Sequence, residues 1–137
     1  MAVEWIAEGS NAFNAAFPFY GNVNDTPAYL RDTTGQVTTE SFYWANRIIA
    51  TLSDAHFGET AIHIERYQNT AEAKGHAFLK EFDAKYIETK PEDVPAYLEE
   101  CNQKIADFAK KETYDLLDQV LLASSREMKN RFARSDA

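Results

Sequence analysis

The stretch YIETKPEDVPAYL, residues 86–98, separates two long amphipathic segments and decides the fold of this chain. Its two prolines interrupt any helix, and Asp93 is a good N-cap for a new helix whose first turn tolerates Pro95. A short connection of this kind favours two antiparallel helices packed as an α-hairpin. We expect the last helix over residues 93–134, with the terminal ARSDA, residues 133–137, frayed.

Apolar residues recur at helical spacing on both sides of this stretch. Gly58 predicts a break or kink, so we expect helices over residues 38–88 that begin near residues 38 and 59, and a third that begins near residue 93. The periodic positions of the first segment are Phe42, Ala45, Ile49, Leu52 and either Ala55 or His56. Those of the second are Ile64, Tyr67, Ala71, Gly75, Phe78, Phe82 and Tyr86. In the last segment Leu98, Cys101, Ile105 and Phe108 lie on one face and Leu116, Leu117, Val120 and Leu121 on another.

The helix expected from residue 38 has a plausible start signal. Thr38 is suited to be its N-cap, which would place Val37 and Phe42 at the two positions of a hydrophobic staple. The preceding Thr-Thr-Gly, residues 33–35, resembles the start of some autoprocessed hydrolases. A threonine nucleophile is expected to open a strand, however, and here a helix is expected to follow within four residues. We therefore interpret residues 33–35 as a turn.

Residues 1–37 are expected to form a hairpin and a turn. The segments VEWIA, residues 3–7, and AAFPFY, residues 15–20, have the composition of strands, and GNVNDTP, residues 21–27, follows as a turn. A hairpin alone would be marginal, so it must pack on the helices. The predicted fold class is mainly α with a short N-terminal β-hairpin (α+β), in a single domain over residues 1–137.

Composition limits the classes of partner. The chain has 22 acidic and 14 basic residues and a net charge of −8, which disfavours nucleic acid because phosphate binding needs clustered positive charge. No apolar run reaches the roughly 20 residues that cross a bilayer, and MAVEWIAEGS lacks the features of a signal peptide. One cysteine excludes an intrachain disulfide and fits a reducing compartment. We expect a cytoplasmic protein without nucleic-acid or membrane partners.

One group of residues has metal-ligand spacing. His56, Glu59 and His63 are three and four positions apart, which on a continuous helix would place two imidazoles and a carboxylate on neighbouring turns. A break at Gly58 would separate them, and no second Glu-x-x-His motif is present to complete a di-metal site. We therefore expect structural or solvated histidines, with no metal and no cofactor.

Cys101 is the only thiol and is not expected to be a nucleophile. Its neighbours Glu99 and Glu100 oppose a thiolate, and Lys104 is the only nearby cation. Its place on the apolar face indicates a small core residue. The Gly-Ser at residues 9 and 10 lacks the second glycine of a nucleophile elbow, and no phosphate-binding glycine loop is present. The residues alone assign no active site.

Several longer segments carry a family resemblance. TPAYLRDTTG (26–35), FYWANRIIA (42–50), HIERYQ (63–68) and KGHAFLKEFD (74–83) stand in the order and spacing found in the C-terminal region of the bacterial dipeptidase A family. WIAEGSNAF (5–13) is similar to the strand and Gly-Ser turn that precede this region, although Asn11 stands where the family has proline. The resemblance covers residues 3 to about 86. It implies a cysteine-type N-terminal-nucleophile hydrolase, with an αββα fold of which this chain is the C-terminal portion.

The resemblance implies a mechanism that this sequence does not complete. The nucleophile of such enzymes is an N-terminal cysteine whose own α-amino group is the base, and neither Met1 nor Ala2 supplies a thiol. Cys101 cannot replace it from the middle of a helix. The family's nucleophile therefore maps to no position here, and the substrate-binding residues stay unassigned.

Two functional hypotheses follow. The chain is expected to be a C-terminal fragment of a cytosolic dipeptidase, inactive alone, that meets its dipeptide substrate only in the complete enzyme. The alternative is a freestanding, non-catalytic helical interaction module. The expected partner is the missing N-terminal catalytic portion or a second copy of the chain in a homodimer, because exposed apolar surface favours association. The aromatic residues that suggest such surface are Trp5, Phe13, Phe17 and Phe19.

Overall fold

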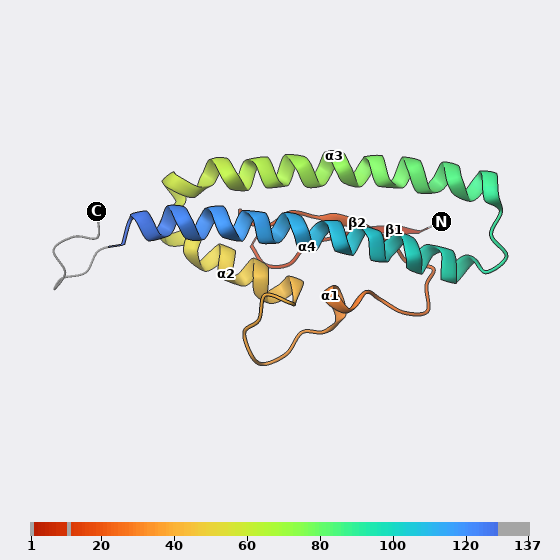
Figure 1. Cartoon of the computed structure of the whole chain (residues 1–137), viewed down its shortest axis with the longest axis horizontal. Coiled ribbons are helices and arrows are strands. Elements are labelled where there is room, and N and C mark those ends of the chain that lie inside the picture. The colour runs from red at the N-terminus through yellow and green to blue at the C-terminus, as the bar shows by residue number, and fades with distance from the viewer. Residues whose placement is uncertain (1, 11, 129–137) are drawn as a thin grey trace.

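The structure is a computed structural model that describes residues 2–10 and 12–128. The chain is mainly helical with one two-stranded antiparallel sheet, as predicted (Figure 1). Its elements are β1 (Val3–Ile6), β2 (Phe17–Tyr20), α1 (Ala28–Arg31), α2 (Phe42–Ala55), α3 (Phe57–Thr89) and α4 (Val94–Arg126).

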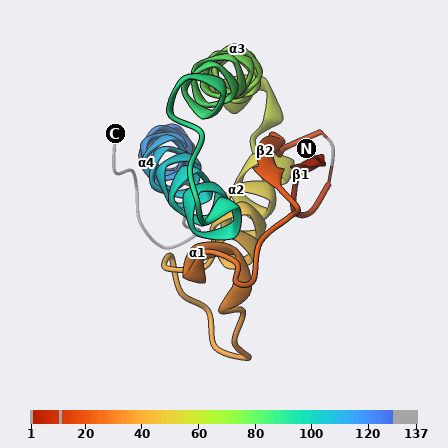
Figure 2. The ribbon, with the colours of Figure 1, turned by 90° about the vertical axis from the view of Figure 1, so that its right-hand side faces the viewer.

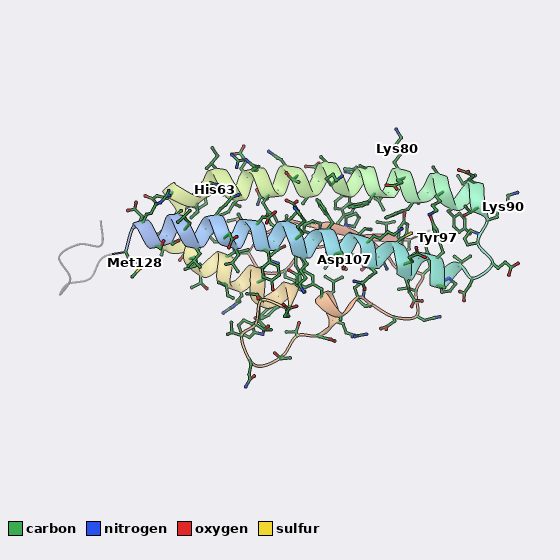
Figure 3. The ribbon with its side chains drawn as sticks, viewed as in Figure 1. His63, Lys80, Lys90, Tyr97, Asp107 and Met128 are labelled. Atoms are coloured by element: carbon green, nitrogen blue, oxygen red, sulfur yellow. The ribbon has the colours of Figure 1, made fainter. Side chains whose placement is uncertain are left out.

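The two longest helices form the predicted α-hairpin. α3 and α4 run side by side in opposite directions along the length of the molecule (Figure 1). Lys90 ends α3 in the left-handed conformation, with a φ of 47°, and the Asp93 side chain accepts a hydrogen bond from the Ala96 amide at 3.0 Å. Near this connection the Tyr97 hydroxyl donates to the Phe82 carbonyl at 2.7 Å, which ties α4 back to α3 (Figure 3). The Asp93 cap is therefore confirmed.

The predicted hairpin is also confirmed. β1 pairs with β2 in a register that places Val3 opposite Tyr20 and Ile6 opposite Phe17. Viewed along the helices, α3 lies on one side of this sheet and α2 on the other, with β2 on the inside and β1 outermost (Figure 2). All four residues of β2 are buried, whereas the two central residues of β1 are exposed. The sheet therefore presents β1 to solvent.

Phe17 of β2 lies at the centre of the core. Its ring makes edge-on contacts with the rings of Phe42, Tyr67 and Phe108, with centroids 5.9, 6.1 and 6.2 Å apart. These rings come from α2, α3 and α4, so one side chain of the hairpin joins all three long helices. The surrounding buried apolar residues include Phe19, Tyr29, Ile49, Ile64, Phe82, Leu98, Ile105, Leu116 and Val120.

The start of α2 differs from the prediction. The helix begins at Phe42 with Ser41 as its N-cap, and the Thr38 hydroxyl instead accepts a hydrogen bond from the Glu40 amide at 3.1 Å. This local bond closes a turn ahead of the helix, which starts four residues later than predicted, and the Ser41 side chain makes no capping hydrogen bond. Val37 is 63% exposed and makes no hydrophobic staple. Phe42 packs into the core instead.

Other boundaries also differ. The chain breaks at His56, between α2 and α3, and Gly58 lies within the first turn of α3. Leu121 was expected on an apolar face but is exposed. α4 ends at Arg126, and residues 129–134 of the predicted helix, with the frayed ARSDA end, lie outside the described residues.

The short helix α1 was not predicted. It lies between the turns interpreted at residues 21–27 and 33–35, and the Pro27 carbonyl accepts hydrogen bonds from the amides of Leu30 and Arg31. A single helical turn lacks the periodic pattern that identifies longer helices. Its Tyr29 side chain is buried against Phe42, so α1 covers the start of α2.

Candidate functional site

A groove of about 510 Å³ lies between the N-terminal hairpin and α3. It has apolar walls, a carboxylate from Glu72 and an imidazole from His76. The Trp5 ring forms one side and lies 4.8 Å from the His76 ring, centroid to centroid. The lining residues are Trp5, Ala7, Asn14, Ala15, Ala16, Gln68, Glu72 and His76.

Gly75 lets the hairpin approach α3 closely. A Cβ atom at this position would lie 2.7 Å from the Trp5 ring and 2.9 Å from Cδ of Pro18. Both distances are shorter than side-chain contacts allow, so an alanine here would push the two strands away from α3. The sequence pattern placed Gly75 on the apolar stripe and did not reveal this role.

The loop between the strands is held by Asn14. Its side-chain Nδ2 donates to the backbone carbonyls of Glu8 and Gly9 at 3.0 and 3.1 Å. The backbone carbonyl of Asn14 accepts a hydrogen bond from Nε2 of Gln68 in α3 at 2.8 Å. Gly9 has a φ of 87°, a conformation that favours glycine. The Gly-Ser turn is therefore fixed to α3 through Asn14.

The inner strand β2 is tied to α4 by one buried side chain. The Tyr20 amide donates to Oδ1 of Asn102 at 2.8 Å, and Nδ2 of Asn102 donates to the Tyr20 carbonyl at 3.0 Å. The Tyr20 hydroxyl donates to Asp83 of α3 at 2.8 Å, and burial together with this carboxylate raises the pKa of Tyr20. Nothing in the sequence indicated Asn102, because its partner lies 82 positions away.

Cys101 is a core residue, as predicted. It is 3% exposed, and burial raises the pKa of its thiol. Both features oppose formation of a thiolate, which is the nucleophilic form.

The structure does not bring the three candidate metal ligands together. His56 stands at the junction of α2 and α3, while His63 lies where α3 faces α4, beside Glu112 and Asp115 (Figure 3). Within residues 2–10 and 12–128, no group of three or more histidine, cysteine, aspartate or glutamate side chains is placed to hold a metal ion.

The Thr-Thr-Gly segment is a loop, as predicted. The Thr34 hydroxyl donates to the Gln36 carbonyl at 2.9 Å, and Nε1 of Trp44 donates to the Thr34 carbonyl at 2.7 Å. These bonds fix the approach to α2. Over the described ranges no helix has the length and apolar character needed to cross a membrane.

Comparison with known proteins identifies the family. Residues 1–70, just over half of the chain, match peptidase family C69. The chain belongs to this family. The match includes the hairpin, the Gly-Ser turn, α1 and α2, and so contains most of the groove described above. The C69 assignment agrees with the resemblance found in the sequence, which is thereby confirmed.

Relatives of this C69 chain carry dipeptidase names. It is 40% identical to the dipeptidase of Bifidobacterium longum, over 98% of this chain and 32% of the relative. It is 40% identical to a probable dipeptidase A of Streptococcus pyogenes and 37% identical to a probable dipeptidase B of Lactococcus lactis, in each case over 98% of this chain and 28% of the relative. The chain thus spans about a third or less of the length of these relatives.

Proposed function

We propose that this chain is the C-terminal part of a C69 dipeptidase and that it completes an enzyme whose nucleophile is supplied by residues outside this sequence. The observation that carries the proposal is the similarity to proteins named dipeptidases across 98% of the chain, for under a third of their length. The reaction class is hydrolysis of the peptide bond of a dipeptide.

The chemistry of the described residues supports a contributing role. Nucleophilic catalysis needs an accessible nucleophile and a nearby base. Cys101, the only thiol in the sequence, is buried in α4 and its pKa is raised. We therefore assign catalysis to an N-terminal cysteine of the remaining part of the enzyme, acting with its own α-amino group.

The arrangement of elements supports the same proposal. The β1–β2 sheet packs on α3 and α4 through β2 and leaves β1 outermost, which allows these strands to form the end of one sheet of an αββα sandwich (Figure 2). We propose that these strands belong to that sandwich. The single cysteine supports a reducing compartment, and we propose a cytoplasmic enzyme.

Reconstitution tests the proposal. Dipeptide hydrolysis, with Leu-Leu as one substrate, is measured for the chain alone, for its Cys101→Ala variant, and for each of these mixed with the part of the S. pyogenes relative that this chain does not match. We expect no turnover above background from the chain alone and turnover from both mixtures, because Cys101 takes no part.

Two results would contradict the proposal. Turnover by the chain alone, abolished in Cys101→Ala, would make Cys101 the nucleophile. A mixture with neither association nor turnover would favour the freestanding interaction module. The large helical core, in which Phe17 contacts α2, α3 and α4, is the observation that favours this alternative.

A further inference from the structure

We propose that the outer edge of β1 is the docking site for an added β-strand from the catalytic portion of the dipeptidase. This inference rests on the proposed function and specifies where the two portions meet. The inference depends on Val3 and Trp5, whose backbone N–H and C=O groups point away from β2. It also depends on Pro18 and Asn102, which block the opposite edge of the sheet.

The hydrogen bonds of the hairpin show which backbone groups point outward. Residues of an antiparallel pair alternate between those that exchange hydrogen bonds with the partner strand and those whose N–H and C=O groups point away from it. The Gly21 amide donates to the Ala2 carbonyl at 2.9 Å, so Ala2 faces β2. In the observed register Glu4 and Ile6 also face β2, and Val3 and Trp5 face outward.

The outer edge of β2 is already closed. Tyr20 is opposite Val3, and its outward amide and carbonyl are both bonded by the Asn102 side chain. Pro18, the other outward residue of β2, has no N–H to donate. A further strand therefore cannot add on this side.

The outer edge of β1 is open. Within the described part of the chain, the Val3 and Trp5 amides have no hydrogen-bond partner, and β1 is the outermost element on its side (Figure 2). Trp5 is 39% exposed. An edge with unpaired N–H and C=O groups is a template for pairing with another strand.

Both faces of the edge offer room for side chains of an incoming strand. Successive side chains of a strand point to opposite faces of the sheet. The 510 Å³ groove beside Trp5 lies on the face of the sheet that packs on α3. A second cleft of about 220 Å³ lies on the opposite face, beside Glu4, Ile6 and Phe19. An added strand can therefore gain hydrogen bonds from the edge and packing from these hollows.

Charge disfavours a second copy as the occupant. A twofold antiparallel pair that uses the outward groups of both Val3 and Trp5 places Glu4 directly opposite Glu4 of the second copy. Like charges directly opposite each other destabilise a strand pair, and each chain carries a net charge of −8. The relatives are more than three times as long as this chain, so family members have ample further chain to supply the strand.

A proline at an outward position tests the edge selectively. Val3→Pro removes the outward amide while leaving the bonds of Glu4 and Ile6 to β2, and Val3→Ala keeps the amide as the matched control. Each variant is mixed with the unmatched part of the S. pyogenes relative, and affinity, dipeptide turnover and residue-resolved amide exchange are measured. Thermal unfolding of each variant alone verifies that the chain stays folded.

We expect Val3→Pro to weaken association by about tenfold or more, Val3→Ala to bind close to wild type, and the Val3 and Trp5 amides to become protected in the complex. An active complex in which Val3→Pro binds as tightly as wild type and these amides stay unprotected would overturn the docking site while leaving the proposed function intact. Absence of any complex would overturn both. Protection of the two amides in the chain alone, rising with its concentration, would identify a second copy as the occupant and overturn the inference.

Discussion

The two strands of the hairpin have the same length but opposite environments. β2 is buried at every position, and Asn102 bonds both of the outward backbone groups of its Tyr20. β1 exposes its two central residues, Glu4 and Trp5. The two strands are hydrogen-bonded to each other, so their different burial comes from their other neighbours. β2 packs against α4, whereas β1 is the outermost element on its side (Figure 2).

The difference in burial indicates that β2 contributes more than β1 to the stability of the chain. Burial of apolar area drives folding, so the side chains of β2 contribute far more than those of β1. The outer strand is held by its ladder with β2 and by the contact of Trp5 with Gly75. We therefore expect substitutions on the inner side to unfold the chain and substitutions on the outer edge to affect association.

The largest effect is expected for Phe17→Ala. This side chain is 1% exposed and contacts three helices, so its truncation should cost about 3–5 kcal/mol of unfolding free energy. Ile6→Ala, at the paired position of β1, is the matched variant and should cost much less because Ile6 is only partly buried. Urea unfolding measures both, and equal losses would remove the contrast between the strands.

Asn102→Ala should have the next largest effect. It leaves the amide and carbonyl of Tyr20 buried without partners, at about 1–3 kcal/mol for each group. Gln103→Ala is the control, since this neighbouring side chain lies on the exposed face of α4 and donates to Asp107 on the same helix. A denaturant midpoint for Asn102→Ala that equals the midpoint for Gln103→Ala would mean that the Tyr20 edge is not closed by Asn102.

Gly75→Ala tests how β1 is held. The added methyl group would meet the Trp5 ring, and we expect a loss of about 1–3 kcal/mol, partly offset by the higher helix propensity of alanine. In a Trp5→Ala background the cost of Gly75→Ala should be smaller but not zero, because the contact with Cδ of Pro18 remains. A double-mutant cycle with no coupling between the two positions would show that the contact is not tight.

The smallest effect is a pH dependence at the start of α2. The Lys110 ammonium and the Tyr114 hydroxyl both bond the Glu40 carboxylate and hold its pKa below the usual value of about 4.3. A lowered folded-state pKa gives stability that is present above this value and is lost as the pH falls through the folded pKa. Glu40→Gln should therefore lower the Tm at pH 7, and this difference should shrink as the pH falls below the usual carboxylate pKa and through the lowered folded-state pKa. A Tm difference that stays unchanged over this pH range would contradict this assignment.

Sequence periodicity predicted the elements that rest on local signals. The α3–α4 hairpin, the Asp93 cap and the two strands follow from spacing, capping chemistry and turn residues within a few positions. The start of α2 was wrong because Thr38 bonds the Glu40 amide in a turn, and a capping hydroxyl does not distinguish a turn from the first turn of a helix.

The features of the candidate site could not be predicted in the same way. Asn102 and Tyr20 are 82 residues apart, and the contact of Gly75 with Trp5 depends on how the hairpin docks on α3. Such pairings are set by tertiary packing, which leaves no periodic trace in the sequence. The family resemblance, by contrast, was carried by contiguous segments and was confirmed by comparison.

Residue-resolved amide hydrogen exchange of the chain alone tests the contrast between the closed and open edges most directly. We predict slow exchange at Tyr20, whose amide is bonded to buried Asn102, and fast exchange at Trp5, whose amide points away from β2. Glu4, which faces β2, provides the reference within β1. Fast exchange at Tyr20, or protection at Trp5 that equals that of Glu4 at a concentration where the chain is monomeric, would contradict the account.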